Sequence, residues 1–235
     1  MLVIYRLCDI KSPLSAKPPV FADDYFKLNE LCLKSFCLAY GDIKPKVIFI
    51  CDHCPEDRYR ELLKIVPFDY EVMFTNVGIN DSCLLQYELA KTTNEDTILF
   101  QECDYLYRPL CGKLMEDAIK KYQLVSPYDH RNFYIDRSIH SQDCKIDLLD
   151  EQHFRTTERN TMTFGMTMEA FEANFEILKK WGYLDNEVWH EMRANGYPLW
   201  VPVPSLATHM VKDFMSPGLD WNKLIQTLNG QPKLT

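Results

Sequence analysis

The first 127 residues alternate short apolar runs with segments whose apolar residues recur at helical spacing. The run 46–50 is almost wholly apolar, as a strand buried on both faces of a parallel sheet requires. A helical pattern over 22–40 ends at Gly41, which suits a helix C-terminus. The other expected elements are strands at 2–5, 70–74 and 97–100 and helices at 55–66 and 81–91. This alternation predicts a mostly parallel sheet covered by helices.

From about residue 128 the pattern changes to short mixed segments around two helices, expected at 168–180 and 185–194. A strand at 199–201 follows the second helix. We expect residues 128–214 to form an annex on the edge of the first sheet and residues 215–235 to form a C-terminal tail. The predicted fold class is therefore α/β, in one domain that spans 1–235.

The composition excludes several classes of protein. Of the 235 residues 46% are hydrophobic, which is enough to bury a core and excludes a disordered chain. A formal charge of −8 argues against a nucleic-acid binder, which needs a basic face. No run approaches the roughly 18 apolar residues of a membrane span, and the N-terminus lacks the apolar region of a signal peptide. We therefore expect a cytoplasmic protein whose partners are small molecules or proteins.

The nine cysteines are an odd and scattered set, which favours a reducing compartment over a disulfide framework. The one Cys-x-x-Cys, from Cys51 to Cys54, is compatible with a redox pair or with half a zinc site. No second Cys-x-x-Cys and no His-x₃-His completes a zinc site. The cysteines are better interpreted as small buried hydrophobic residues.

Two carboxylates, Glu102 and Asp104, directly follow the strand expected at 97–100. Ligands of open α/β sheets bind beyond the carboxyl ends of the strands, so a site is first expected there. In an extended chain residues two apart point to the same side, where both carboxylates could share a divalent cation. Such a cation would in turn hold a diphosphate. The alternative is a solvated acidic turn.

A second informative stretch begins at Asp185 and ends at Gly196. An acidic start and a glycine end are typical of a short helix, in which Asp185 is ordinarily a cap or a partner of the helix dipole. The same carboxylate would also face a pocket if the annex folds over the sheet.

Together the two stretches resemble glycosyltransferases of the GT-A fold, especially those like family 2. In that family an apolar strand enters a D-x-D motif, and here residues 98–101 enter Glu102-Cys103-Asp104. The family's later order of E-D, R-x-x-G-Y, V-P and His is matched by Leu184-Asp185, Arg193-Ala194-Asn195-Gly196-Tyr197, Val203-Pro204 and His209. Segments 128–130 and 155–164 resemble those of small stand-alone members from bacteria and large DNA viruses, which implies that they lie between donor and acceptor. The alternative is an ordinary turn and a β-hairpin.

The resemblance implies that Glu102 and Asp104 bind the metal and the diphosphate, and that His209 completes the metal shell. The implied cofactor is Mn²⁺, or Mg²⁺ in its place. Asp185 matches the family's general base, which removes the proton of the acceptor hydroxyl in inverting members. A leucine replaces the acidic residue that usually precedes this base, and Glu187 is the reserve candidate.

The resemblance also implies a donor site at the ends of the first three strands. Asp52 falls where the family holds an acceptor for the nucleobase. Tyr5, Arg6 and Asp9 follow the first strand, where the nucleoside docks. Asp81 opens the third helix, in a region that lines the donor in relatives.

The leading hypothesis is a metal-dependent glycosyltransferase. It would move a sugar from a nucleoside-diphosphate sugar, with a UDP-sugar favoured, to the hydroxyl of a glycan or other acceptor by an inverting displacement. A retaining transferase is one alternative. A nucleotidyltransferase is the second alternative. Such enzymes usually carry a glycine-rich loop after the first strand, and the absence of glycine from Arg6-Leu7-Cys8-Asp9 argues against this alternative. The third alternative is an inactive relative that binds a sugar, a nucleotide or a protein.

Overall fold

The core of the structure is one nine-stranded sheet with the strand order β3-β2-β1-β4-β9-β6-β10-β8-β7. The computed structural model describes residues 1–9, 21, 24–136 and 144–230. The strands of this sheet are β1 (Leu2–Cys8), β2 (Lys46–Asp52), β3 (Tyr70–Thr75), β4 (Thr97–Glu102), β6 (Leu124–Val125), β7 (Ile146–Leu149), β8 (Gln152–Thr157), β9 (Phe164–Thr167) and β10 (Leu199–Val203). A separate antiparallel pair consists of β5 (Tyr105–Tyr107) and β11 (Ala207–His209).

The four strands of the first half are parallel to one another. β1 pairs with β2 and with β4, and β2 pairs with β3. In this register Cys8 lies beside Asp52, and Arg6 lies beside Glu102. The carboxyl ends of these strands therefore meet at one edge of the sheet, although the residues come from well-separated parts of the chain.

The strands of the second half continue the same sheet beyond β4. β9 pairs antiparallel with both β4 and β6, and β10 pairs parallel with β6. β8 is antiparallel to β10, and β7 forms the outer edge. The α/β fold class and the mostly parallel central sheet are thus confirmed.

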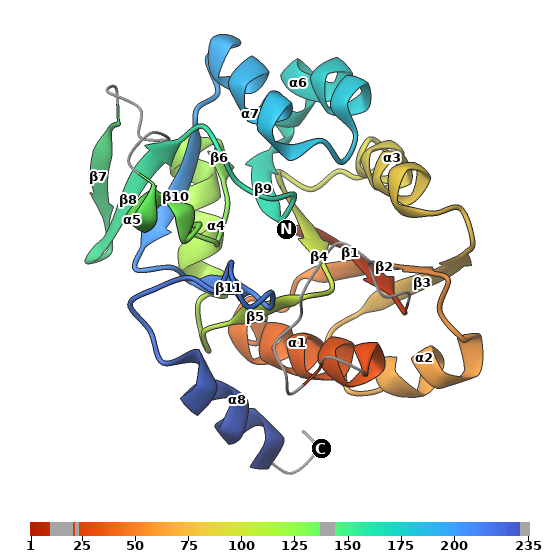
Figure 1. Cartoon of the computed structure of the whole chain (residues 1–235). Helices are drawn as coiled ribbons and strands as arrows, with labels where there is room; N and C mark the ends of the chain where they lie inside the picture. The colour runs from red at the N-terminus through yellow and green to blue at the C-terminus, as the bar shows by residue number, and fades with distance from the viewer. Residues whose placement is uncertain (10–20, 22–23, 137–143, 231–235) are drawn as a thin grey trace.

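Helices cover both faces of the sheet (Figure 1). One face packs against α1 (Tyr25–Tyr40), α2 (Glu56–Leu63) and α4 (Gly112–Tyr122), and the other against α3 (Ile79–Ala90), α6 (Met168–Trp181) and α7 (Asp185–Ala194). In β2, Val47 and Phe49 enter the first apolar cluster and Ile50 enters the second, which is why successive positions must be apolar. α8 (Trp221–Gly230) packs on α1 through the buried Trp221, and α5 (Asn132–Ile135) is a short helix.

Three of the described helices, α4, α5 and α8, do not appear among the elements expected from the hydrophobic pattern. α4 begins with Gly112 behind Cys111, which makes no side-chain cap bond, so the usual start signals are missing. Its packing depends on Gly165 in β9, where a Cβ would lie 2.4 Å from Cδ1 of Ile119 in α4. Within the part of the chain that the structure describes, no helix is long and apolar enough to cross a membrane.

Candidate active site

Asp104 and His209 are brought together at the carboxyl edge of the sheet. β4 ends at Glu102, a turn contains Cys103 and Asp104, and β5 then pairs antiparallel with β11. This pairing places His209 opposite Tyr105, and Nε2 of His209 lies 3.1 Å from Oδ2 of Asp104. Both side chains are largely buried but retain some exposure. Two groups 105 residues apart in sequence therefore form one polar pair.

This pair has a geometry compatible with a divalent cation. Two ligand bonds of about 2.1 Å at a right angle put about 3.0 Å between the ligand atoms, close to the observed 3.1 Å. Nδ1 of His209 is buried and has no hydrogen-bond partner among the described residues. A further polar group beside Nδ1 would therefore give this buried nitrogen the hydrogen-bond partner that buried polar atoms ordinarily have. Among the same residues, no three His, Cys, Asp or Glu side chains are placed together to hold a metal ion.

Glu102 is placed as the counter-ion of Arg6. Nη2 of Arg6 donates to Oε1 of Glu102 at 2.9 Å, across the β1–β4 pairing. Arg6 is only 8% exposed, and its Nε is buried without a partner among the described residues. Burial by itself lowers the pKa of Arg6, but the neighbouring Cys83 and Glu102 raise it overall. The guanidinium is therefore charged at the edge where Asp104 lies.

The expected common orientation of Glu102 and Asp104 depends on an extended chain, and the chain is not extended there. Cys103 and Asp104 form a turn between β4 and β5. The alternation of side chains along a strand ends at such a turn. Consequently Asp104 contacts His209, whereas Glu102 contacts Arg6, and the predicted three-residue shell is reduced to two gathered residues.

The carboxylate of Asp52 accepts hydrogen bonds from nearby backbone amides and side chains. Its Oδ1 accepts from Oγ1 of Thr75 and from the Val77 amide, both at 2.8 Å, and its Oδ2 accepts from the Gly78 amide at 3.0 Å. Oδ2 also lies 2.9 Å from Nδ1 of His53. These partners use the roughly four acceptor positions of a carboxylate. The expected acceptance from a nucleobase is therefore replaced by a structural role, because Asp52 holds the turn that starts α3.

The same hydrogen bonds set the ionisation of Asp52. Burial by itself would raise the pKa of Asp52, but the bonds from His53, Val77 and Thr75 outweigh it, so the pKa is lowered. The carboxylate is therefore charged at neutral pH.

The other expected donor residues have different environments. Tyr5 is fully buried between Phe36 and Phe49, at ring distances of 5.2 and 5.4 Å, which argues against the expected nucleoside contact. Asp9 is half-buried beyond β1, and its burial raises its pKa. Asp81 is exposed in the first turn of α3. Asp9 and Asp81 thus remain accessible to a ligand, whereas Tyr5 does not.

α7 begins at Asp185, as the sequence predicts, and Glu187 is exposed in its first turn. The side chain of Asp185 lies outside the described part of the structure. Trp189 connects α7 to the segment that precedes β9, because its Nε1 donates to the Asn160 carbonyl at 2.9 Å. Nδ2 of Asn160 in turn donates to the Tyr128 carbonyl at 2.7 Å. The role of Asp185 as a general base stays a prediction.

Aromatic side chains surround His209, and of these Tyr128 belongs to the segment 128–130 identified in the sequence, whereas Phe214 belongs to no motif. Its ring is stacked on Tyr105 at 5.0 Å and on Phe214 at 5.9 Å, and Tyr128 meets it edge-on at 6.3 Å. The ring of His130 lies 5.2 Å from Phe214. Burial and the nearby His209 lower the pKa of His130 to about 4, so this ring is neutral at pH 7.

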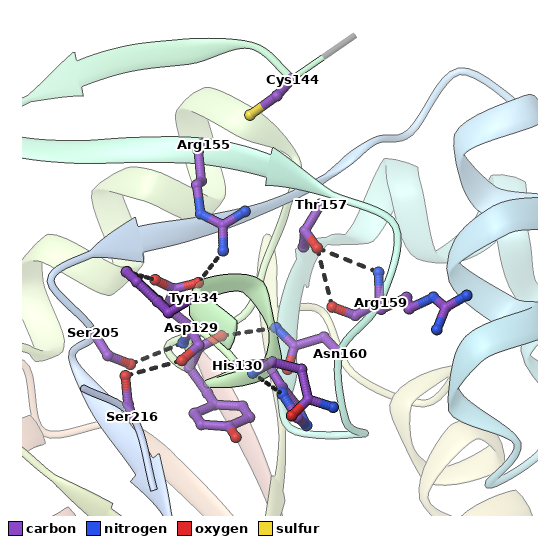
Figure 2. Close-up of polar contacts among 12 residues, drawn as sticks. Asp129, His130, Tyr134, Cys144, Arg155, Thr157, Arg159, Asn160, Ser205 and Ser216 are labelled. Atoms are coloured by element: carbon purple, nitrogen blue, oxygen red, sulfur yellow. Dashed lines mark hydrogen bonds and ion pairs between the residues drawn. The ribbon is translucent and has the colours of Figure 1, made fainter. Parts of the chain in front are cut away.

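Asp129 anchors the segment that carries Tyr128 and His130 (Figure 2). Its carboxylate is fully buried and accepts from Nη2 of Arg155 at 2.5 Å and from the Tyr134 hydroxyl. Its backbone N–H donates to Oγ of Ser205 at 2.9 Å, and its carbonyl accepts from Oγ of Ser216 at 2.9 Å. One residue therefore joins β8, α5 and both segments that flank β11.

No protein-family model and no curated protein matches this chain. Several solved structures do. A 4-diphosphocytidyl-2C-methyl-D-erythritol synthase from Anaerococcus prevotii is 13% identical, with a TM-score of 0.51, and the match covers 97% of this chain and 94% of that one. The inositol-1-phosphate CTP transferase from T. maritima is 11% identical, with a TM-score of 0.50 and the same coverage. A candidate nucleotide-diphospho-sugar transferase from Desulfovibrio desulfuricans is 8% identical, with a TM-score of 0.50 over 85% of this chain and 78% of that one.

The protein has a GT-A-like fold. At 8–13% identity these likenesses concern the arrangement of the chain and not its chemistry. In this fold the parallel strands present their carboxyl ends to the ligand. Arg6, Glu102, Asp104 and His209 lie at that edge.

Proposed function

We propose that this protein is a glycosyltransferase that moves a sugar from a nucleoside-diphosphate sugar to an acceptor hydroxyl. The observation that carries the proposal is the Asp104–His209 pair, which the β5–β11 pairing creates beyond the end of β4. The GT-A-like fold supports it, because the pair lies at the edge where ligands of open α/β sheets bind. A UDP-sugar is the favoured donor, and the acceptor is a glycan or another hydroxyl compound.

Asp104 and His209 would hold the divalent cation, Mn²⁺ or Mg²⁺, with a carboxylate oxygen and an imidazole nitrogen as ligands. When bound, the cation would neutralise negative charge on the diphosphate leaving group. Arg6 supplies a second positive charge at the same edge, and its bond to Glu102 orients the guanidinium. Asp9 and Asp81 are the accessible carboxylates for contacts to the rest of the donor.

We assign the general base to Asp185, with Glu187 in reserve, at the start of α7. A carboxylate there would remove the proton of the acceptor hydroxyl during a single inverting displacement. The anomeric configuration of the product separates this mechanism from retaining transfer. Neutralising the correct base should lower turnover by about 100-fold or more and leave donor binding unchanged.

The proposal is tested by calorimetric titration of UDP and GDP with and without Mn²⁺, followed by a screen of nucleotide sugars for metal-dependent hydrolysis. Asp104→Asn should abolish metal-dependent binding and turnover. Asp69→Asn is the matched control, because Asp69 is exposed near the opposite edge of the sheet, and this variant should behave as the parent. Wild-type turnover in Asp104→Asn would show the metal assignment to be wrong, and a parent that binds no nucleotide would favour an inactive relative.

A further inference from the structure

Two rings beside the Asp104–His209 pair have no role in the function proposed above. Phe214 is 36% exposed, and its ring plane is within 20° of that of His209. The ring of His130 is a second neighbour of Phe214, with a centroid distance of 5.2 Å and an angle of 48° between the rings. A partly exposed aromatic side chain and an imidazole therefore lie together next to the candidate metal pair.

The hydrogen bonding of His130 decides what its ring can offer. Nδ1 of His130 accepts from the backbone N–H of Asn132 at 3.1 Å. An imidazole nitrogen that accepts a hydrogen bond carries no proton, so the proton of the neutral ring is on Nε2. His130 is therefore a hydrogen-bond donor through Nε2 and carries no charge that would repel a neighbouring cation.

Both rings are held in place before any ligand arrives. The amide of Phe214 donates to the Val211 carbonyl at 2.8 Å, and its carbonyl accepts from the Tyr128 hydroxyl. Two residues on, the Ser216 amide donates to Oγ1 of Thr208 at 2.8 Å. The buried Asp129 fixes the chain directly before His130 (Figure 2). Such pre-organisation lowers the entropic cost of binding.

We propose that Phe214 and His130 form a subsite for a sugar ring. A pyranose has an apolar face of C–H groups, which packs on an aromatic ring, and hydroxyl groups around its edge, which accept hydrogen bonds. Phe214 provides the face, and Nε2–H of His130 provides the donor. This inference rests on the proposed function and deepens it, since the sugar belongs either to the donor or to the acceptor. A flat nucleobase is the competing ligand, and binding of a bare nucleoside diphosphate tests it.

The test compares Phe214→Ala and His130→Leu with two conservative variants, Phe214→Tyr and His130→Gln. The tyrosine keeps the aromatic face, and the glutamine amide can place an N–H near the position of Nε2. Calorimetry with Mn²⁺ measures the Kd of a bare nucleoside diphosphate and of the nucleotide sugar that the parent hydrolyses. Hydrolysis and transfer assays give KM and kcat for donor and acceptor separately.

For Phe214→Ala and His130→Leu we expect the Kd of the bare nucleoside diphosphate to stay within twofold of the parent. The Kd of the nucleotide sugar should weaken about tenfold if the subsite holds the donor's sugar. If it holds the acceptor's sugar, donor hydrolysis should be unchanged and the acceptor KM should rise about tenfold. In either case Phe214→Tyr and His130→Gln should recover most of the loss.

Three results would overturn the subsite. Unchanged donor and acceptor constants in both disruptive variants would show that the rings contact no sugar. A bare nucleoside diphosphate that weakens as much as the nucleotide sugar would assign the rings to the base or to the metal pair. A parent that binds no nucleoside diphosphate would refute the proposed function itself, and the subsite with it, whereas the first two results would leave the proposed function standing.

Discussion

The buried ion pair between Asp129 and Arg155 allows a sharp test of the structure around the site. The carboxylate is fully buried and lies 2.5 Å from the guanidinium. Arg155→Met keeps an apolar stem and removes the charge, so Asp129 loses its counter-ion inside the protein. Removing one partner of a buried pair costs about 3–5 kcal/mol. We expect the lower end, about 3 kcal/mol at pH 7, because the Tyr134 hydroxyl still donates to the carboxylate.

The cost should depend on pH. Burial raises the pKa of Asp129, and Arg155 partly opposes the rise, so without Arg155 the pKa in the folded state is higher still. Because the pKa of Asp129 is raised in the folded state, its neutral form favours folding, and this contribution to the free energy of unfolding is complete below pH 3.8, the ordinary pKa. The contribution is lost as the pH rises through the raised pKa. In the variant the carboxyl group stays neutral to higher pH. The deficit relative to the parent is therefore largest at pH 7 and shrinks as the pH falls.

Urea unfolding followed by tryptophan fluorescence at pH 7 and pH 5 measures this deficit. Arg159→Met is the matched control, because Arg159 is exposed in the same segment and its replacement should change the free energy of unfolding by less than about 0.5 kcal/mol. The double variant Asp129→Asn/Arg155→Met should recover part of the loss, since no buried charge remains. A deficit in Arg155→Met below about 1 kcal/mol at pH 7, or one equal at both pH values, would refute the buried pair.

Two further predictions concern the scaffold. Gly165→Ala should lower the free energy of unfolding by about 2 kcal/mol, because its Cβ would meet Cδ1 of Ile119 at 2.4 Å. Adding Ile119→Val should restore part of that loss in thermal melts, and a single variant as stable as the parent would contradict the close approach. Asp52→Asn should cost about 2 kcal/mol and speed hydrogen exchange at the Val77 and Gly78 amides. Because the pKa of Asp52 is lowered, its contribution to the free energy of unfolding is present above pH 3.8 and is lost as the pH falls through the lowered pKa. The stability deficit of Asp52→Asn should therefore vanish in acid. A deficit that persists in acid would be inconsistent with a charged Asp52 that accepts these hydrogen bonds.

The hydrophobic pattern by itself predicts most of the first half of the fold. Strands buried on both faces need unbroken apolar runs, and residues 46–50 show one inside β2. The bounds of α7 follow from its acidic start and the glycine after its end, and the structure begins and ends it at the same residues. Local periodicity and end signals suffice for these elements, because the forces behind them act between residues close in sequence. α4 is missed since it lacks such signals and depends on contact with Gly165.

The partners of the polar groups are decided only by the tertiary structure. The resemblance to GT-A glycosyltransferases implies that Asp104 and His209 lie together, and the β5–β11 pairing places them 3.1 Å apart. The sequence does not reveal the turn after β4, beside which Glu102 contacts Arg6, or the backbone amides that donate to the Asp52 carboxylate. A side chain's partner depends on its direction and on what distant segments bring near it. The expected strand ends and the family resemblance therefore indicate which charged residues lie at the sheet edge, whereas the turns and strand pairings determine which of them contact each other.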